Sequence, residues 1–153
     1  MVTIRKACNG DWGQMYRWIM QEEVRFGFTG EAISSWDEFC EYWGSRRMSW
    51  GNYVIQDDGE IVGHLWLVIG EDNIPEVGYL VGEIVRWGNG IGREGCRLGV
   101  EVLSEMGFSK VRAYIKDGNE RSMRVVLGLG FKQVCERDGG QKVMEKALNG
   151  SRN

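Results

Sequence analysis

The sequence predicts a single α/β domain in which helices flank a mixed, mostly antiparallel sheet. The chain has 153 residues, which is room for one core of ordinary size and no second domain. Its hydrophobic periodicity changes along the chain in the order strand, two helices, three strands, helix, strand, helix, two strands. We expect the domain to span residues 1–148 and a flexible tail to follow at 149–153.

Composition and charge narrow the class of protein. The formal net charge is -3 and the isoelectric point is near 5.3, which argues against a nucleic-acid partner because such binding depends on Lys and Arg at phosphates. Four scattered cysteines, without a Cys-x-x-Cys pair, and one histidine argue against a structural zinc site. The N-terminus lacks a signal-peptide pattern and no apolar run could cross a bilayer, so we expect a cytoplasmic protein with no membrane partner.

The first third of the chain predicts a strand followed by a pair of helices. Val2–Lys6 alternates apolar and polar residues, as a strand does. Asp11 then precedes a stretch with apolar residues at helical spacing, and Ser34 or Ser35 can cap a second helix. The apolar residues of the first helical stretch are Met15, Trp18, Ile19 and Val24.

Three strands are predicted next. Residues 52–56 and 61–69 are strand-like and are separated by Asp-Asp-Gly-Glu, which favours a hairpin turn. A third strand is predicted over 76–81. Gly78 and the following Gly82 indicate either a bulge or a close approach of another group to the backbone.

The remaining elements are a long helix, a strand, a short helix and two strands. Apolar residues recur every four positions after Gly92, which predicts a helix over 93–106. Alternation predicts a strand over 109–116, and residues 119–129 are expected to form a short helix that stops before a glycine. Two strands, 131–135 and 142–146, then close the chain around a Gly-Gly turn.

The turn Arg-Trp-Gly-Asn-Gly-Ile-Gly at 86–92 joins the third sheet strand to the long helix. Glycines let a backbone approach a phosphate closely, and a helix N-terminus presents unpaired N–H groups to an anion. The alternative is an ordinary type I′ hairpin at Asn89–Gly90, but that turn requires a strand after Gly92, where the period is helical. A Walker-type loop is excluded because no Gly-Lys-Ser/Thr follows the glycines.

Two motifs resemble the GNAT superfamily of acetyltransferases. The turn is similar to that family's acetyl-CoA pyrophosphate loop, Gln/Arg-x-x-Gly-x-Gly/Ala, with Trp87 where Gln or Arg is usual; the Trp-Gly-x-Gly variant looks like the RimJ/RimL-like branch. Downstream, Asn-Glu-Arg-Ser at 119–122 and Leu-Gly-Phe at 129–131 resemble the family's Asn-x-x-Ser and Leu-Gly-Phe signature at its spacing. The pattern resemblance covers nearly the whole chain.

The resemblance implies acetyl-CoA as co-substrate and assigns residues to bind it. The backbone at 79–81 would pair with the pantetheine arm, the N–H groups of the turn would bind the pyrophosphate, and Asn119 would form a hydrogen bond near the arm. The implied cofactor-binding residues are Leu80, Val81, Trp87, Gly88, Asn89, Gly90, Ile91, Gly92, Arg93, Asn119 and Ser122.

The implied activity is direct transfer of acetyl to a primary amine: a protein N-terminus, or a small molecule such as a polyamine, an amino acid or an aminoglycoside. Such a transfer needs a base, for which Glu76 is the candidate by position, with an exposed strand carboxylate as its alternative and Glu83 as a second acidic candidate. The family's tyrosine proton donor matches Val126 here. We expect Tyr79 to replace it, with Tyr114 or unassisted departure of the thiolate as alternatives.

Other readings stay open. His64 and Cys96 are interpreted as structural side chains. The missing tyrosine at Val126 favours, as a second hypothesis, a noncatalytic acyl-CoA-binding or regulatory module on the same fold. The third hypothesis, a protein of this fold that binds no CoA, rests on Trp87. A homodimer paired along the last strands is also compatible with the sequence.

Overall fold

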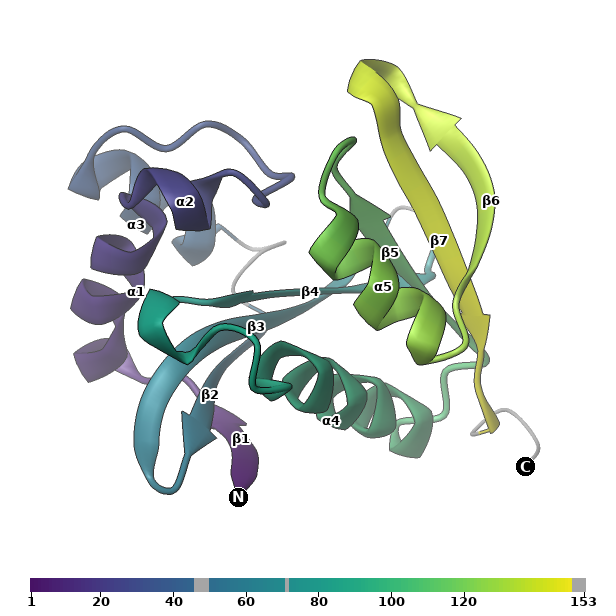
Figure 1. Cartoon of the computed structure of the whole chain (residues 1–153), viewed down its shortest axis with the longest axis horizontal. Helices are drawn as coiled ribbons and strands as arrows, with labels where there is room; N and C mark the ends of the chain where they lie inside the picture. The colour runs from purple at the N-terminus through teal and green to yellow at the C-terminus, as the bar shows by residue number, and fades with distance from the viewer. Residues whose placement is uncertain (46–49, 71, 150–153) are drawn as a thin grey trace.

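The structure, a computed structural model, is described over residues 1–45, 50–70 and 72–149; of the tail predicted at 149–153, residues 150–153 lie outside the described residues. Its centre is a seven-stranded sheet of order β1-β2-β3-β4-β5-β7-β6 (Figure 1). Neighbouring strands are antiparallel except β4 and β5, which are parallel. The strands are β1 (Val2–Lys6), β2 (Gly51–Asp57), β3 (Glu60–Ile69), β4 (Pro75–Val81), β5 (Lys110–Ile115), β6 (Lys132–Arg137) and β7 (Gln141–Ala147).

Five α-helices accompany the sheet within the described residues: α1 (Trp12–Ile19), α2 (Glu22–Arg25), α3 (Trp36–Gly44), α4 (Ile91–Glu105) and α5 (Glu120–Gly128). The single helix expected after Asp11 is wrong, because the chain leaves the helical conformation at Gln21, where ψ is 128°. The side chain of Gln21 donates from Nε2 to the carbonyl of Gly82 at 3.2 Å. A tertiary contact to the end of β4 thus accompanies the break between α1 and α2.

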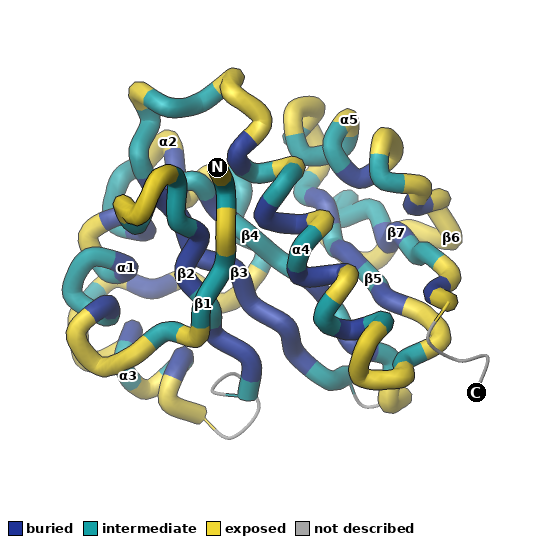
Figure 2. Tube along the Cα trace, turned by 90° about the horizontal axis from the view of Figure 1, so that it is seen from below, coloured by how far each residue is buried: buried dark blue, intermediate teal, exposed yellow. Residues whose placement is uncertain are grey.

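The helices cover both faces of the sheet. Neighbouring residues of β2 point to opposite faces, so Ile55 packs in one core with α4 and α5 whereas Val54 packs in a second core with α1 and α3. Buried positions follow β2 and β3 between these layers (Figure 2). No helix in the described ranges is long and apolar enough to cross a membrane.

Helix α4 packs closely on the sheet. A Cβ placed at Gly95 would lie 2.7 Å from Ile55 Cδ1, and one at Gly99 would lie 3.0 Å from Leu65 Cδ2. Both glycines therefore remove a side chain where the helix meets β2 and β3. This fixes the position of the N-terminal end of α4 relative to β4.

Strands β4 and β5 separate soon after they meet. The β3–β4 ladder runs without interruption from Ile69↔Pro75 to Gly63↔Val81, whereas among the described residues β4 and β5 are in register only at Glu76 and Arg112. The second half of β4 therefore has a free side. Of the two predicted alternatives, the close approach is confirmed and the bulge is not: β4 has no register shift against β3, and Gly78 makes room for the indole of Trp66, which a Cβ would overlap.

Candidate active site

A cavity of about 690 Å³ opens where β4 and β5 separate. Its walls are the second half of β4, the glycine-rich turn, the first turn of α5 and the segment after α2. A volume of this size is typical of pockets that enclose a cofactor-sized ligand. All but one of the residues predicted to bind the cofactor line this cavity: Leu80, Val81, Trp87, Gly88, Gly90, Ile91, Gly92, Arg93, Asn119 and Ser122. The exception is Asn89, which is absent from the cavity wall.

The glycine-rich turn leads directly into α4. Gly88 and Gly90 have φ angles of 87° and 76°, a region that side chains disfavour, and Gly90 is the N-cap. The first backbone bond of the helix runs from Glu94 N–H to Gly90 O at 3.0 Å. The N–H groups at 91–93 therefore have no acceptor within the helix and stand at the positive end of its dipole. A helix after the turn rules out the type I′ hairpin.

The backbone of β4 also presents polar groups to the cavity. Gly82 N–H donates to Val62 O of β3 at 2.8 Å, and the ladder alternates in two-residue steps. The N–H and C=O of Leu80 consequently face β3, whereas those of Tyr79 and Val81 face the gap. The carbonyl of Val81 already accepts a hydrogen bond from Trp87 Nε1 at 2.8 Å.

Trp87 connects three elements at the rim of the cavity. Besides its bond to β4, its ring carries the guanidinium of Arg121 from α5, with Cζ 4.3 Å from the ring centroid. This is the geometry of a cation–π contact. Asn89, which follows in the turn, uses its side-chain Nδ2 to bind Arg86 O at 2.9 Å and so closes the turn on itself.

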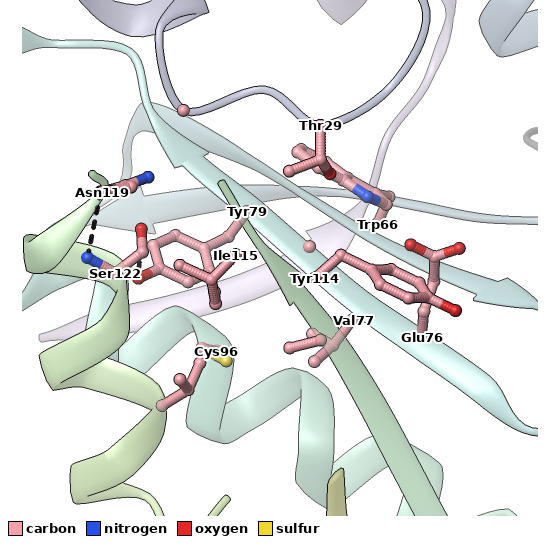
Figure 3. A pocket seen from close by; sticks show the side chains of 14 residues that line it. Thr29, Trp66, Glu76, Val77, Tyr79, Cys96, Tyr114, Ile115, Asn119 and Ser122 are labelled. Carbon is pink, nitrogen blue, oxygen red and sulfur yellow. Dashed lines mark hydrogen bonds between the residues drawn. The ribbon is translucent and has the colours of Figure 1, made fainter. Parts of the chain in front are cut away.

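Asn119 is the N-cap of α5. Its Oδ1 accepts from the backbone N–H of Ser122 at 3.2 Å, so the carbonyl oxygen of the side chain is engaged in holding the helix end (Figure 3). Its Nδ2 lies close to Gly27, where a Cβ would approach to 2.8 Å. The amide nitrogen is therefore the part of Asn119 directed across the cavity.

A smaller pocket of about 30 Å³ continues between β4 and β5. Figure 3 shows Tyr79 beside Ser122 on one side and Glu76 with Tyr114 on the other. Trp66 borders both this pocket and the large cavity. Both sequence-predicted catalytic residues line this pocket, and because three positions separate them on an unbulged strand their side chains leave β4 on opposite faces. The apolar floor of the pocket includes Val77, Cys96, Ala113, Ile115 and Val126.

Tyr79 is a partly buried side chain that lines both cavities. Its hydroxyl lies 3.4 Å from Ser122 Oγ, and burial raises the pKa of the phenol. Tyr79 therefore stays protonated at neutral pH and can donate a proton. Val126, where the resemblance places a tyrosine, is 1% exposed on the pocket floor and carries no polar group.

Three other candidates lie outside this arrangement or are inert. Glu83 lines neither cavity. His64 is buried beside Asn52, with Nε2 3.0 Å from Oδ1, and burial lowers the pKa of His64 to about 3. Burial raises the pKa of Cys96 to about 12, so its thiol is not an activated nucleophile. The structural interpretation of His64 and Cys96 is confirmed.

Sequence reasoning missed the segment after α2, which crosses the cavity. The Phe26 ring lies 5.1 Å from Lys116 Nζ, just after β5, and Thr29 O accepts from Gln141 Nε2 of β7 at 3.4 Å. This stretch has no periodicity or motif that could have identified it. Arg121 was also missed, although it lies inside the Asn-x-x-Ser motif and its position could have been found there.

Comparison with known proteins defines the family. The family model described as an acetyltransferase (GNAT) domain matches residues 1–132, and the chain belongs to this family. An uncharacterized protein of Methanocaldococcus jannaschii is 30% identical over 142 residues, which are 87% of this chain and 28% of that protein. A mycothiol acetyltransferase of Frankia alni is 34% identical over 92 residues, which are 53% of this chain and 28% of that protein. The chain thus spans less than a third of the length of these curated relatives.

Solved structures confirm the predicted fold class. A domain from Methanocaldococcus jannaschii superposes with a TM-score of 0.86 at 26% identity, covering 97% of this chain and 99% of that one. Spermidine N-acetyltransferase from Vibrio cholerae, solved with CoA and spermine, gives 0.82 at 16% identity over 99% and 98% of the chains. Aminoglycoside acetyltransferase AAC(6')-Ib, solved with coenzyme A, gives 0.80 at 18% identity over 96% and 95%. The latter two are similar in fold.

Proposed function

We propose that this protein is an acetyl-CoA-dependent N-acetyltransferase that transfers the acetyl group directly to a primary amine. The observation that carries this proposal is a pair of adjacent cavities at β4 that share Trp66, Tyr79, Asn119 and Ser122 in their walls. The larger cavity is lined by the glycine-rich turn with its unpaired N–H groups, and the smaller one by Glu76 and Tyr79. Membership of the acetyltransferase family and the CoA-bound structures of similar fold support it.

The residues present suit acetyl-CoA. The N–H groups at 88–93 would bind the pyrophosphate, since they end in an unsatisfied helix N-terminus. The pantetheine arm would pair with the backbone of Tyr79 and with the N–H of Val81, because those groups face the gap. Leu80 would contribute apolar contact only. Asn119 would donate from Nδ2 to the arm, its oxygen being held by the helix cap.

The chemistry follows from the two ends of the small pocket. The amine nitrogen would attack the thioester carbonyl carbon, and Glu76 would accept the proton that the amine loses. A backbone N–H of β4 that faces the gap would stabilise the developing oxyanion. As the carbon–sulfur bond breaks, Tyr79 would donate its proton to the departing thiolate, and Ser122 would hold the phenol in position.

For the acetyl acceptor we propose a chemical class, amines, and no individual compound. Proteins of similar fold have been solved with spermine and with aminoglycosides, and these acceptors are amines. We extend the class to small-molecule or peptide amines and place the chain in the RimJ/RimL-like branch, supported by Trp87 and Gly88 in the turn. A homodimer remains compatible with this proposal.

A second function is favoured by Val126. Because the pocket floor lacks the tyrosine hydroxyl expected there, the protein could bind acyl-CoA without turning it over, as a regulatory module. Turnover distinguishes the two functions. The binding module predicts saturable binding of acetyl-CoA and no release of CoA with any amine.

Calorimetric titration with acetyl-CoA, with CoA and NADH beside it, tests the shared premise. We expect micromolar binding of acetyl-CoA and CoA and none of NADH. CoA release would then be followed over a panel of polyamines, amino acids, aminoglycosides and peptides. Release with at least one amine supports the enzyme; binding without release supports the module; absence of acetyl-CoA binding contradicts both.

A further inference from the structure

We propose that Arg121, held on the ring of Trp87, supplies from α5 the cationic contact to the CoA pyrophosphate that the glycine-rich turn lacks. The inference rests on the proposed function and assigns a role to a residue outside the turn. In the resembling loop pattern a Gln or Arg stands at position 87, whereas this chain has an aromatic ring there. That ring carries a guanidinium from another element.

The geometry fixes the guanidinium at the cavity rim. Arg121 Cζ lies 4.3 Å from the centroid of the Trp87 ring, and both residues line the large cavity. Trp87 itself is held by the 2.8 Å bond from Nε1 to Val81 O, so the ring is a fixed platform. A guanidinium that contacts an aromatic face keeps N–H donors at its edge for an anion.

Three other arginines line the wall, Arg86, Arg93 and Arg124, but among the described residues it is Arg121 whose guanidinium lies over the Trp87 ring. Arg86 is paired with Asp57 at 3.1 Å and with Glu60 at 2.5 Å, so two carboxylates neutralise it. The guanidinium of Arg93 lies at the last turn of α5, where a Cβ on Gly128 would be 3.9 Å from it. Arg121 forms no ion pair with any residue in the described part of the chain, and its charge is therefore available to a ligand.

A pyrophosphate bound only by backbone N–H groups would keep its charge uncompensated except by the helix dipole. A planar guanidinium adds charge-assisted hydrogen bonds, which are stronger than those of neutral donors. Trp87 would orient that guanidinium before the ligand arrives, which reduces the ordering required on binding. Trp87 and Arg121 therefore act as one unit in this interpretation.

Calorimetric titration of the whole chain with CoA and with dephospho-CoA tests the assignment. We expect Arg121→Ala to weaken both ligands by about tenfold or more, because both contain the pyrophosphate and a charge-assisted contact is lost. The affinity of Arg121→Lys should lie between those of the parent protein and Arg121→Ala, since lysine keeps the charge and loses the planar fork of donors. Arg121 is exposed, so its replacement leaves the core intact. Arg97→Ala is the matched control, because Arg97 pairs with Glu94 and Glu101 outside the cavity.

A double-mutant cycle tests the link to Trp87. Trp87→Arg should restore a cation to the turn. In that background, Arg121→Ala should therefore lower the affinity for CoA by less than about threefold. Unchanged affinity of Arg121→Ala for both ligands overturns the inference. A loss confined to CoA also overturns it, since it would place Arg121 at the 3′-phosphate. Failure of the parent protein to bind CoA at all would instead refute the proposed function.

Discussion

Tyr79 illustrates how a functional group can be supplied from a different element. The floor position on α5 holds Val126, whereas a phenol enters the same pocket from β4 and meets Ser122. Burial raises the pKa of Tyr79, which keeps the proton on the hydroxyl at neutral pH. The side chain thus has the protonation state that a donor to a thiolate requires.

We expect Tyr79→Phe to lower kcat by about 100-fold, because general-acid assistance is typically of this size or larger. The affinity for acetyl-CoA should change little, since the backbone of β4 is preserved. Steady-state CoA release and calorimetry measure the two quantities separately. Tyr53→Phe, outside both cavities, is the control. If Tyr114→Phe produced the loss instead, Tyr114 would be the donor.

Glu76 is expected to act as the base. Glu76→Gln should lower kcat/KM by about 100-fold near neutral pH while leaving acetyl-CoA affinity unchanged. The deficit should shrink as the pH approaches the pKa of the amine, about 10 for an alkylamine, because the acceptor then arrives deprotonated. A pH profile of kcat/KM checks this. Glu83→Gln is the control near the end of the same strand, and an equal effect in both variants would contradict the assignment.

At the scale of elements, ligand binding is expected to depend on the backbone conformation of the turn between β4 and α4. Gly90 has φ 76° and caps the helix, although a Cβ there would meet no atom within 4 Å. The constraint is therefore the backbone conformation. A branched side chain at such φ costs about 1–3 kcal/mol or forces the turn to move.

We expect Gly90→Val to weaken acetyl-CoA binding by more than about tenfold, because the N–H groups of the turn would no longer converge on the pyrophosphate. Gly59→Val is a matched control: Gly59 has φ 87° in the β2–β3 turn with equally open surroundings and lies outside the cavity. Thermal unfolding should show a similar loss of stability in both variants, and calorimetry a loss of binding only in Gly90→Val. Equal binding in both would show that the turn does not hold the ligand.

At the scale of the whole molecule, His64 couples the stability of the core to pH. It is 2% exposed beneath Trp43 and Trp66, with ring centroids 4.5 Å and 5.1 Å away. The pKa of His64 falls from 6.5 to about 3 because burial disfavours the charged ring. The unfolded chain therefore binds a proton that the folded protein does not over this interval.

The direction in which the free energy of unfolding changes with pH follows from that difference in protonation. The stabilisation is fully present above 6.5, the unfolded pKa, and is lost progressively as pH falls toward about 3. At about pH 5 the expected loss is about 2 kcal/mol of unfolding free energy from this group. Denaturant unfolding at several pH values measures it. A free energy of unfolding that does not fall between pH 6.5 and 5 would contradict a buried neutral His64.

Local patterns were enough to predict most elements. The alternation of β2 and β3, the Asp58–Gly59 turn between them and the helical period after the glycine-rich turn all depend on neighbouring residues, and the structure confirms them. The Ser35 cap is confirmed in the same way, with Oγ accepting from Glu38 N–H at 3.1 Å. The break at Gln21 could not be predicted, because its partner Gly82 is distant in sequence.

The sequence by itself determined the glycine-rich turn, the helix that follows it and the Asn-x-x-Ser cap of α5, since each is encoded by a short local pattern. The catalytic roles of Glu76 and Tyr79 stay predictions. Only the tertiary structure decided that Tyr79 reaches Ser122 and that Arg121 lies on Trp87. The first contact joins residues 43 positions apart in sequence and the second joins residues 34 positions apart. Their geometry is set by how α4, α5 and the sheet pack together, because side-chain contacts between distant segments exist only after the chain has folded.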